Sequence, residues 1–234
     1  MDSVLLPAHI AIIMDGNRRW AKREGKDTPS GHREGAENLK RIARYANEIG
    51  IKYMTVYAFS TENWKRSEVE VSALMKILKF FINDFIKNSK SNIKIKVIGK
   101  RDNLSEDLKT AINSIEDKSK NNDGMVLNIA FNYGGREEIV ATTKKIAKAV
   151  QEGNVHINDI DEVFFANNIY TNSQPDPDLL IRTSGEERIS NFLLWQIAYS
   201  EFYFTNKYWP EFSSKDLDEA IEAYTKRNRK FGGK

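Results

Sequence analysis

Segments with the composition of β-strands alternate with segments of helical spacing along the chain, and this alternation restricts the fold more than any other feature. The expected strands are apolar, β-branched or aromatic runs at Ile10–Met14, Tyr53–Phe59, Ile93–Lys100, Met125–Asn132, Leu179–Arg182 and Glu201–Thr205. The expected helices are Gly31–Glu48, Glu68–Lys87, Leu104–Lys120, Glu137–Gln151, Asp161–Asn168 and Ser213–Arg227. Strands and helices in this order predict an α/β fold, a single domain over residues 1–234 with a mainly parallel sheet surrounded by helices.

One expected strand differs from the others in its pattern. Ile93, Ile95 and Val97 alternate strictly with Lys94 and Lys96. A strand with one polar face is typical of a sheet edge. We therefore expect this strand at an edge of the sheet.

Composition and charge narrow the classes of function. Lysine and arginine exceed aspartate and glutamate by only three, so recognition of nucleic acid through bulk positive charge is not favoured. There is no cysteine, which excludes disulfides and thiolate metal sites. The longest charge-free runs, Ser3–Met14 and Ile189–Ser200, are too short for a membrane-spanning helix of ~20 residues. With no signal-peptide pattern at the start, these features predict a soluble cytoplasmic protein.

Polar clusters follow four of the expected strands, at the point where each strand ends. They are Asp15-Gly16-Asn17-Arg18-Arg19, Ser60-Thr61-Glu62-Asn63-Trp64, Asn132-Tyr133-Gly134-Gly135-Arg136 and Arg182-Thr183-Ser184-Gly185-Glu186. Ligands of parallel α/β sheets bind beyond the carboxyl ends of the strands. Glycine lets backbone N–H groups approach an anion, and the planar guanidinium group suits phosphate oxygens. Because Mg²⁺ takes one or two carboxylates together with phosphate oxygens and water, we expect a diphosphate site with Mg²⁺.

Each cluster taken singly has a plainer interpretation. Asp15 at a strand end can cap a helix, surface arginines are ordinarily solvated, and Gly134-Gly135 can be a simple turn. The sequence contains neither of the usual nucleotide motifs, G-x-x-x-x-G-K-[ST] and G-x-G-x-x-G, and it lacks the Asp-Asp-x-x-Asp motif of synthases that make all-trans polyprenyl chains. The hypothesis of a diphosphate site therefore depends on four strand ends that share one chemistry.

Five ordered motifs resemble those of the cis-prenyltransferase family, most closely its bacterial undecaprenyl diphosphate synthases. They are HIAIIMDGNRRWAK, YAFSTENWKRSEVEVSALM, NIAFNYGGREEI, DLLIRTSGEERISNFLLWQIAYSEFYF and WPEF, and the similarity extends from about Pro7 to Gly233. The resemblance implies that isopentenyl diphosphate is condensed repeatedly onto farnesyl diphosphate. The implied product is undecaprenyl diphosphate, the lipid carrier precursor for cell-wall synthesis, and the implied cofactor is Mg²⁺. Product length and the preferred allylic primer stay open.

The resemblance also assigns roles to individual residues. Asp15 resembles the essential catalytic and metal-binding acid, Asn63 is expected to be catalytic, and Glu201 is expected as a second metal ligand. A first-site loop for the allylic diphosphate is expected to contain Gly16, Asn17 and Arg19, with Arg18 and Trp20 as further substrate-binding residues and His32 near the leaving group. A mobile segment that shapes and closes the site is expected to contain Ser60, Asn63, Trp64, Arg66 and Glu70, and Thr61 and Glu62 are expected to bind substrate. Arg182, Arg188 and Ser190 resemble the clamp for isopentenyl diphosphate.

The growing chain would need an apolar wall. The resemblance implies a hydrophobic tunnel beside the Glu68–Lys87 helix, with the small Ala58 leaving room, whereas the alternative is that this helix face is ordinary core.

Two positions depart from the family pattern. No arginine precedes His32 within Lys26–Ser30, and Lys230 stands where the family tail often has arginine. Before His32, one phosphate contact is either missing or supplied by Lys26. In the tail, lysine keeps the charge but loses the bidentate fork, so both departures affect the expected strength of phosphate binding.

Assembly is suggested by the segment Phe192–Phe212, which contains nine aromatic residues. Interface cores are enriched in such residues, although all nine can also pack within one chain. The resemblance implies a homodimer with Glu201 near the interface and Lys230–Gly233 completing the partner's site. The product would be delivered to the membrane, with at most peripheral contact of the protein.

Other classes of function stay open at this stage. A non-catalytic subunit of a heteromeric prenyltransferase would lack the Asp-Gly-Asn signature, which this chain keeps at Asp15-Gly16-Asn17. A binding protein for anionic lipid headgroups would use the arginines without chemistry. RNA binding through Thr225–Lys230 is a further alternative, but a solvated helix end explains that run more simply.

Overall fold

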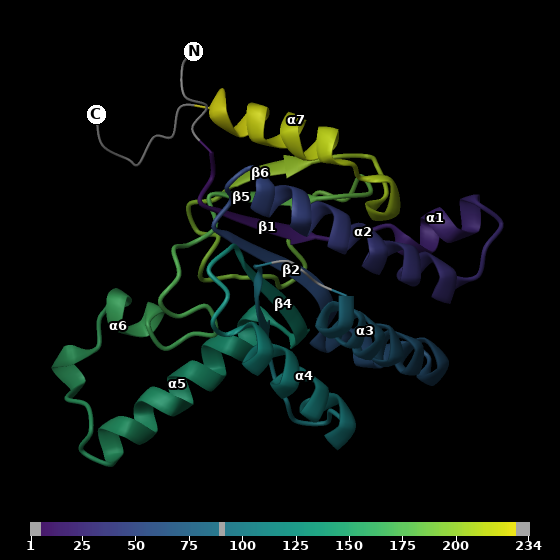
Figure 1. The fold of residues 1–234 in the computed structure, drawn as a ribbon. Helices are drawn as coiled ribbons and strands as arrows, with labels where there is room; N and C mark the ends of the chain where they lie inside the picture. Colours follow the sequence, from purple (N-terminus) through teal and green to yellow (C-terminus); the bar gives the residue numbers. More distant parts are fainter. Residues whose placement is uncertain (1–5, 89–91, 228–234) are drawn as a thin grey trace.

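A sheet of six parallel strands organises the part of the chain that the structure describes. In the computed structural model this part is residues 6–88 and 92–227, and the strand order is β3-β4-β2-β1-β5-β6 (Figure 1). The strands are β1 His9–Ile13, β2 Tyr53–Ser60, β3 Lys94–Ile98, β4 Val126–Tyr133, β5 Leu179–Arg182 and β6 Glu201–Phe204. All five neighbouring pairs are parallel, so the predicted α/β fold with a mainly parallel sheet is confirmed.

Seven α-helices accompany these strands in the described residues. They are α1 Asn17–Arg23, α2 Thr28–Glu48, α3 Glu68–Asn88, α4 Glu106–Ser119, α5 Gly135–Gln151, α6 Glu162–Ala166 and α7 Ser214–Thr225. Short 3-10 helices span η1 Thr61–Lys65, η2 Ile157–Asp159 and η3 Trp209–Glu211. Within residues 6–88 and 92–227, none of the helices is both long and apolar enough to cross a bilayer.

Six of the helices were predicted, with shifted ends, and α1 was not. Helix α2 begins at Thr28 because Asp27 caps it by accepting a hydrogen bond of 2.9 Å from the Ser30 N–H group. The segment after Gly16 was expected as a loop, but it forms α1, whose one buried residue is Ala21. A helix with so little buried apolar surface shows no amphipathic period in the sequence, which is why periodicity missed it.

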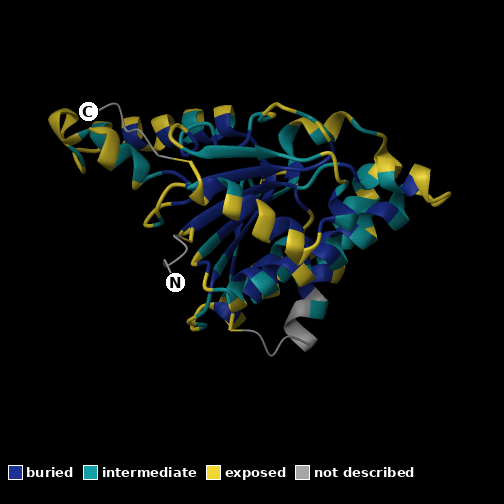
Figure 2. Ribbon diagram, turned by 90° about the horizontal axis from the view of Figure 1, so that it is seen from above, coloured by how far each residue is buried: buried dark blue, intermediate teal, exposed yellow. Residues whose placement is uncertain are grey.

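Apolar cores lie on both faces of the sheet. Ile10 and Ile12 of β1 belong to the larger core, together with residues of α2, α3, α4 and α7. Ala11 and Ile13 point to the other face and pack near Phe192. Figure 2 shows the buried strands between the exposed outer surfaces of the helices. Because both faces are covered, β1 is buried along its whole length, which explains its continuous apolar sequence.

The predicted edge strand, β3, does lie at an edge of the sheet. Two of its backbone N–H groups have partners on α4 instead of a further strand. Ile95 N donates to Ser119 Oγ at 3.0 Å, and Val97 N donates to Glu116 Oε1 at 2.9 Å. Side chains of α4 therefore occupy donors that would otherwise be free to pair with another chain.

Helices α1 and α2 approach closely because α2 has glycine at the contact. A Cβ atom added at Gly31 would lie 2.3 Å from the backbone oxygen of Asn17, and one added at Gly35 would lie 2.5 Å from the Asn17 side-chain oxygen. Any larger residue would push α1 away from α2. The two glycines thereby fix the position of α1, which carries Arg18 and Arg19.

A buried polar network crosses the middle of the sheet. The two ring nitrogens of His9 lie 2.7 Å from the Pro175 carbonyl oxygen and 2.8 Å from Thr55 Oγ1. Asn128 Nδ2 donates to the same Thr55 oxygen at 2.9 Å. Burial lowers the pKa of His9 to about 4, against the opposing effect of the hydrogen bond to Pro175. The ring is therefore neutral in the folded protein at neutral pH.

We expect the free energy of unfolding to fall as the pH is lowered from 6.5 towards 4. In this window the unfolded chain protonates His9, whereas the folded chain holds it neutral, so protons favour the unfolded state. The effect should approach roughly 3 kcal/mol near pH 4. Urea unfolding at neutral and acidic pH should show a weaker pH dependence for His9→Gln than for the wild type. The control His156→Gln, at an exposed position, should keep the wild-type dependence, and an unchanged dependence in His9→Gln would contradict the assignment.

Candidate active site

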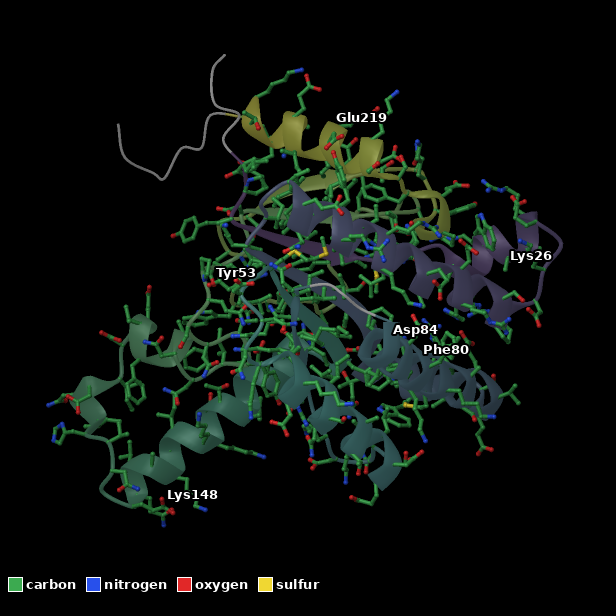
Figure 3. All side chains as sticks on the ribbon, viewed as in Figure 1. Lys26, Tyr53, Phe80, Asp84, Lys148 and Glu219 are labelled. Carbon is green, nitrogen blue, oxygen red and sulfur yellow. The ribbon has the colours of Figure 1, made fainter. Side chains whose placement is uncertain are left out.

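A pocket of about 1190 Å³ opens at the carboxyl edge of the sheet, where β1, β2 and β5 end. In Figure 3, Lys26, which lines it, lies on the side of the molecule occupied by α1, whereas Tyr53, the first residue of β2, lies towards the opposite edge. The predicted site residues that line the pocket are Asp15, Gly16, Asn17, Arg18, Arg19, His32, Ser60, Glu62, Asn63, Arg66, Arg182, Arg188 and Ser190. The structure thus brings most of the predicted site together.

Asp15 is held at the end of β1 by several hydrogen bonds. Its N–H group donates to Thr183 Oγ1 at 2.9 Å, and its Oδ1 accepts from the Gly16 N–H group at 2.7 Å. Its Oδ2 accepts from Arg182 Nη2 at 2.8 Å, and Arg19 Nη2 lies 3.4 Å from Oδ1. The carboxylate is only partly buried, so it remains accessible to a ligand in the pocket.

Arg182 forms the buried wall beside this carboxylate. Its side chain is 4% exposed. Its Nη1 donates to Ser190 Oγ at 2.9 Å and also to the Arg188 carbonyl oxygen. Within the described residues its Nε has no hydrogen-bond partner. Because Arg182 lines the pocket, its guanidinium group is well placed to bind an anion that enters it.

Arg19 reaches from α1 to the turn after β5. It donates from Nη1 to the Ser184 carbonyl oxygen at 3.1 Å and to Glu186 Oε1 at 3.1 Å. Ser184 and Gly185 both have positive φ angles, 78° and 77°, so the chain turns sharply there. This turn places the segment after β5 next to the first turn of α1.

A second charged group lies on the other side of the pocket, where α2 meets α3. Glu70 accepts a hydrogen bond of 2.6 Å from Arg66 and lies 3.5 Å from His32 Nε2 and 3.8 Å from Arg18. Burial lowers the pKa of His32, and the charge of Arg66 adds to this effect. Burial opposes ionisation of Glu70, but Arg66 and Arg18 together outweigh it and the pKa of Glu70 is lowered. The group therefore combines a neutral imidazole, an ionised carboxylate and two guanidinium ions.

Four of the remaining predicted residues do not line the pocket but lie on elements that border it. Glu70 belongs to the charged group just described, and Thr61 is the first residue of η1. Trp64 Nε1 donates to Asn132 Oδ1 at 2.7 Å. Trp20 packs against Lys26, whose Nζ lies 4.6 Å from the ring centroid. All four can act on the pocket only through their neighbours or after a movement.

Glu201 is the predicted site residue that the structure does not bring to Asp15 within one chain. It is the first residue of β6, whereas Asp15 follows the end of β1, and all strands are parallel. Glu201 therefore lies at the amino ends of the parallel strands, whereas Asp15 lies at their carboxyl ends. Glu201 Oε2 pairs with Arg227 Nη1 at 2.8 Å.

The end of β4 also differs from the expectation that four strand ends would build one site. Its residues do not line the pocket, because the segment after β5 covers them. Gly135 N donates to the Asn191 carbonyl oxygen at 2.7 Å, and Arg136 N donates to Asn191 Oδ1 at 2.9 Å. The glycine pair thus binds the protein's own chain, and the pocket is formed from three strand ends.

Several pocket residues were missed by the sequence reasoning. They are Lys22, Asp27, Thr28, Tyr57 and Asn191. Lys22 follows Arg18 and Arg19 by four and three positions, so all three share one face of α1. Recognition of α1 as a helix would have identified Lys22. Asn191 has a positive φ angle of 63°, a feature that its sequence context does not reveal.

The donor set of the pocket constrains the kind of metal it could hold. Within the described residues there is no group of three or more His, Asp or Glu side chains arranged around a metal position. Asp15 offers a partly exposed carboxylate beside arginines suited to phosphate. Such a set fits an ion that takes most of its ligands from a phosphorylated substrate and from water, as Mg²⁺ does.

The parallel sheet and its arginine-lined pocket define an α/β protein equipped to bind phosphorylated ligands at the carboxyl edge of the sheet. Comparison with known proteins gives the family. Residues 13–232 match the family model described as "Putative undecaprenyl diphosphate synthase". The chain therefore belongs to this family, and it is a cis-prenyltransferase.

Named relatives agree with this assignment. The chain is 53% identical over 229 residues to an isoprenyl transferase from Fusobacterium nucleatum, with 97% of this chain and 96% of the relative covered. It is 46% identical to the (2E,6E)-farnesyl-diphosphate specific ditrans,polycis-undecaprenyl-diphosphate synthase of Micrococcus luteus, covering 100% and 94%. Among solved structures, lavandulyl diphosphate synthase from Lavandula x intermedia in complex with dimethylallyl diphosphate is similar with a TM-score of 0.94 and 43% identity, covering 97% and 99%.

Proposed function

We propose that this transferase condenses isopentenyl diphosphate repeatedly onto farnesyl diphosphate to make undecaprenyl diphosphate, in the cytoplasm. The observation that carries the proposal is the convergence of Asp15 with Arg19 and Arg182 in one pocket. The name of the Micrococcus luteus relative, at 46% identity, supports the choice of farnesyl diphosphate and of this product.

The pocket offers two places for a diphosphate group. The allylic diphosphate lies beside α1, near Gly16, Asn17, Arg18, Arg19 and His32, all of which line the pocket. His32 Nε2 is buried in this part without a hydrogen-bond partner among the described residues. Isopentenyl diphosphate lies beside Arg182, Arg188 and Ser190. Asp15 stands between the two places.

The residues of the chain stabilise charge that develops as the reaction proceeds. The C1–O bond of the allylic substrate breaks and its electron pair leaves with the diphosphate. A new bond forms between that C1 and C4 of isopentenyl diphosphate, and a proton is lost from C2. Guanidinium groups held beforehand near the leaving diphosphate stabilise its added charge, and one such donor is worth about 3 kcal/mol in related cases.

Mg²⁺ is the cofactor that the donor set fits. Asp15 would hold it from the protein side, and substrate phosphates and water would complete its shell. When bound, the ion supplies Lewis-acid stabilisation of diphosphate charge. Glu201 is proposed as a further metal-binding residue only in the context of a second chain. Within one chain it lies at the amino ends of the strands, whereas Asp15 lies at their carboxyl ends.

The hydrophobic tunnel is part of the proposal. Apolar side chains extend the pocket from the charged end towards α3, where Ala58 and Leu74 line it. Met75 and Leu78 follow along the same helix and pack on the larger core. A prenyl chain would grow along this wall.

A homodimer is proposed as the working form. Tyr199 is 77% exposed, and it lies in the aromatic segment between β5 and β6. An exposed aromatic residue in such a segment supports an interface between two copies. The proposed contribution of Lys230–Gly233 to the partner's site lies outside the described residues. Light scattering at assay concentration tests the dimer.

The proposed reaction is tested by incubating the wild-type protein with farnesyl diphosphate and radiolabelled isopentenyl diphosphate. We expect label in a long polyprenyl diphosphate, with chromatography giving the chain length. EDTA should abolish the reaction, because it removes the ion that Asp15 is proposed to hold and that stabilises the diphosphate charge. Added Mg²⁺ should restore the reaction. Binding of both substrates without any turnover would instead favour a binding protein for anionic lipid headgroups.

A further inference from the structure

A carboxylate without an assigned role bridges the two diphosphate places. Glu186 Oε1 lies 3.1 Å from Arg19 Nη1, and Glu186 Oε2 accepts a short hydrogen bond from Arg188 Nη1. Arg19 comes from α1, and Arg188 comes from the segment after β5. Glu186 itself does not line the pocket. One side chain therefore touches an arginine from each diphosphate place without occupying either.

The backbone that carries Glu186 is braced on its outer side. Ser184 N donates to the Lys207 carbonyl oxygen at 2.7 Å, and Gly185 N donates to the Thr205 carbonyl oxygen at 2.9 Å. Both residues have positive φ angles, so the turn has a defined shape. Glu186 thus starts from a fixed position.

The two arginines differ in how far they depend on Glu186. The Arg188 side chain is 61% exposed, and among the described residues its guanidinium group has no side-chain partner other than Glu186. The Arg19 side chain is 43% exposed, and Glu186 holds it together with the Ser184 carbonyl oxygen and Asp15. A long exposed side chain loses rotamer freedom when it binds a ligand, and prior orientation reduces that loss. The hydrogen bond from Arg188 lowers the pKa of Glu186, so its carboxylate is ionised at neutral pH.

We propose that Glu186 is a positioning residue shared by both diphosphate places, because it orients Arg19 and Arg188 towards the pocket before the substrates bind. The inference rests on the proposed function for the identity of the two ligands. It assigns the carboxylate to substrate binding and not to bond breaking. Its loss should therefore affect both substrates together.

The test compares Glu186→Gln with the matched control Glu187→Gln. Glu187 is the adjacent exposed glutamate, and it has no ion pair among the described residues. Both changes remove one negative charge from the same segment. Glu186→Gln should raise the KM values for farnesyl and isopentenyl diphosphate on the order of three- to tenfold each, with kcat nearly unchanged. Glu187→Gln should leave both KM values near wild type.

Double-mutant cycles separate orientation of the arginines from a general structural effect. In an Arg19→Ala background, Glu186→Gln should no longer raise the KM for farnesyl diphosphate. In an Arg188→Ala background, it should no longer raise the KM for isopentenyl diphosphate. Additive effects in both backgrounds would overturn the proposal. So would an effect on one substrate alone, or lower KM values, which would show that Glu186 competes with the diphosphates.

A titration with inorganic pyrophosphate and Mg²⁺ makes the same comparison without turnover. Glu186→Gln should bind pyrophosphate more weakly than Glu187→Gln and the wild type. Equal affinities would overturn the inference. An inactive wild type that still binds pyrophosphate would refute the proposed reaction but leave this comparison valid, so the two failures are distinguishable.

Discussion

Replacing Asp15 with alanine is expected to lower turnover by two to three orders of magnitude or more, while the protein stays folded. The carboxylate is the protein's ligand for the proposed metal, and it also accepts a hydrogen bond from Arg182 at 2.8 Å. Its loss removes the metal contact and leaves the arginine without its acidic partner. Arg182 lines the pocket, so water can take the place of the lost carboxylate beside its buried guanidinium group, and the protein should stay folded with a measurable loss of stability. Turnover of labelled isopentenyl diphosphate measures the first effect, and thermal unfolding measures the second.

Two further variants test whether the loss of turnover in Asp15→Ala comes from the loss of this particular charge. Asp15→Asn keeps the size and one hydrogen-bonding oxygen but removes the charge, so it should be nearly as inactive as alanine. Asp218→Ala is the matched control, because Asp218 accepts a hydrogen bond of 2.7 Å from Tyr45 outside the pocket. It should retain normal turnover. A folded Asp15→Ala protein with near-normal turnover would remove Asp15 from the catalytic role.

Arg182→Ala should lower kcat/KM for isopentenyl diphosphate more than for the allylic substrate. The expected loss is about 2–3 kcal/mol, or roughly 30- to 150-fold, because a charge-assisted contact with phosphate disappears. Arg182 is buried and also holds Ser190 Oγ at 2.9 Å, so its truncation disorders the rest of the clamp. Arg188→Ala should act in the same direction with a smaller effect, since Arg188 is exposed. Steady-state kinetics with each substrate varied in turn provides the measurement.

The controls for Arg182 separate charge from geometry. Arg182→Lys keeps the charge but loses the planar fork, so its kcat/KM should fall between the wild type and alanine. Arg101→Ala removes an equally well-paired arginine, bonded to Asn113 and Glu116 outside this pocket, and should leave both substrates unaffected. Equal losses for the two substrates in Arg182→Ala would show that the proposed division of the pocket is wrong.

Much of the architecture was predictable because the spacing of apolar residues along the sequence indicates each strand and helix. The strict alternation in β3 and the three- and four-residue spacing in α3 each reflect which side chains meet the core. The continuous apolar run of β1 likewise follows from burial on both faces of the sheet. Since parallel strands end at one edge, the polar clusters after β1, β2 and β5 were predictable as neighbours.

Two other features, helix α1 and the covered end of β4, could not be predicted from local periodicity. Helix α1 buries Ala21 alone, so no apolar period marks it, and the glycines that seat it lie in a different helix. The end of β4 has the same composition as the other strand ends, yet Asn191 covers it. In both cases a contact from a distant segment decides the outcome, and composition cannot identify that segment.

The sequence by itself determined the α/β class, the parallel sheet and the set of residue types at the strand ends, because each depends on neighbours within a few positions along the chain. Only the tertiary structure decided which of those side chains meet. Asp15 and Arg182 are 167 positions apart and bond at 2.8 Å because β1 and β5 pair in parallel with Ile13 beside Arg182. Glu186 bridges Arg19 and Arg188 for a related reason, since the turn after β5 faces the first turn of α1. Strand register and helix packing are set by the whole core, so these partnerships arise only when the chain is folded.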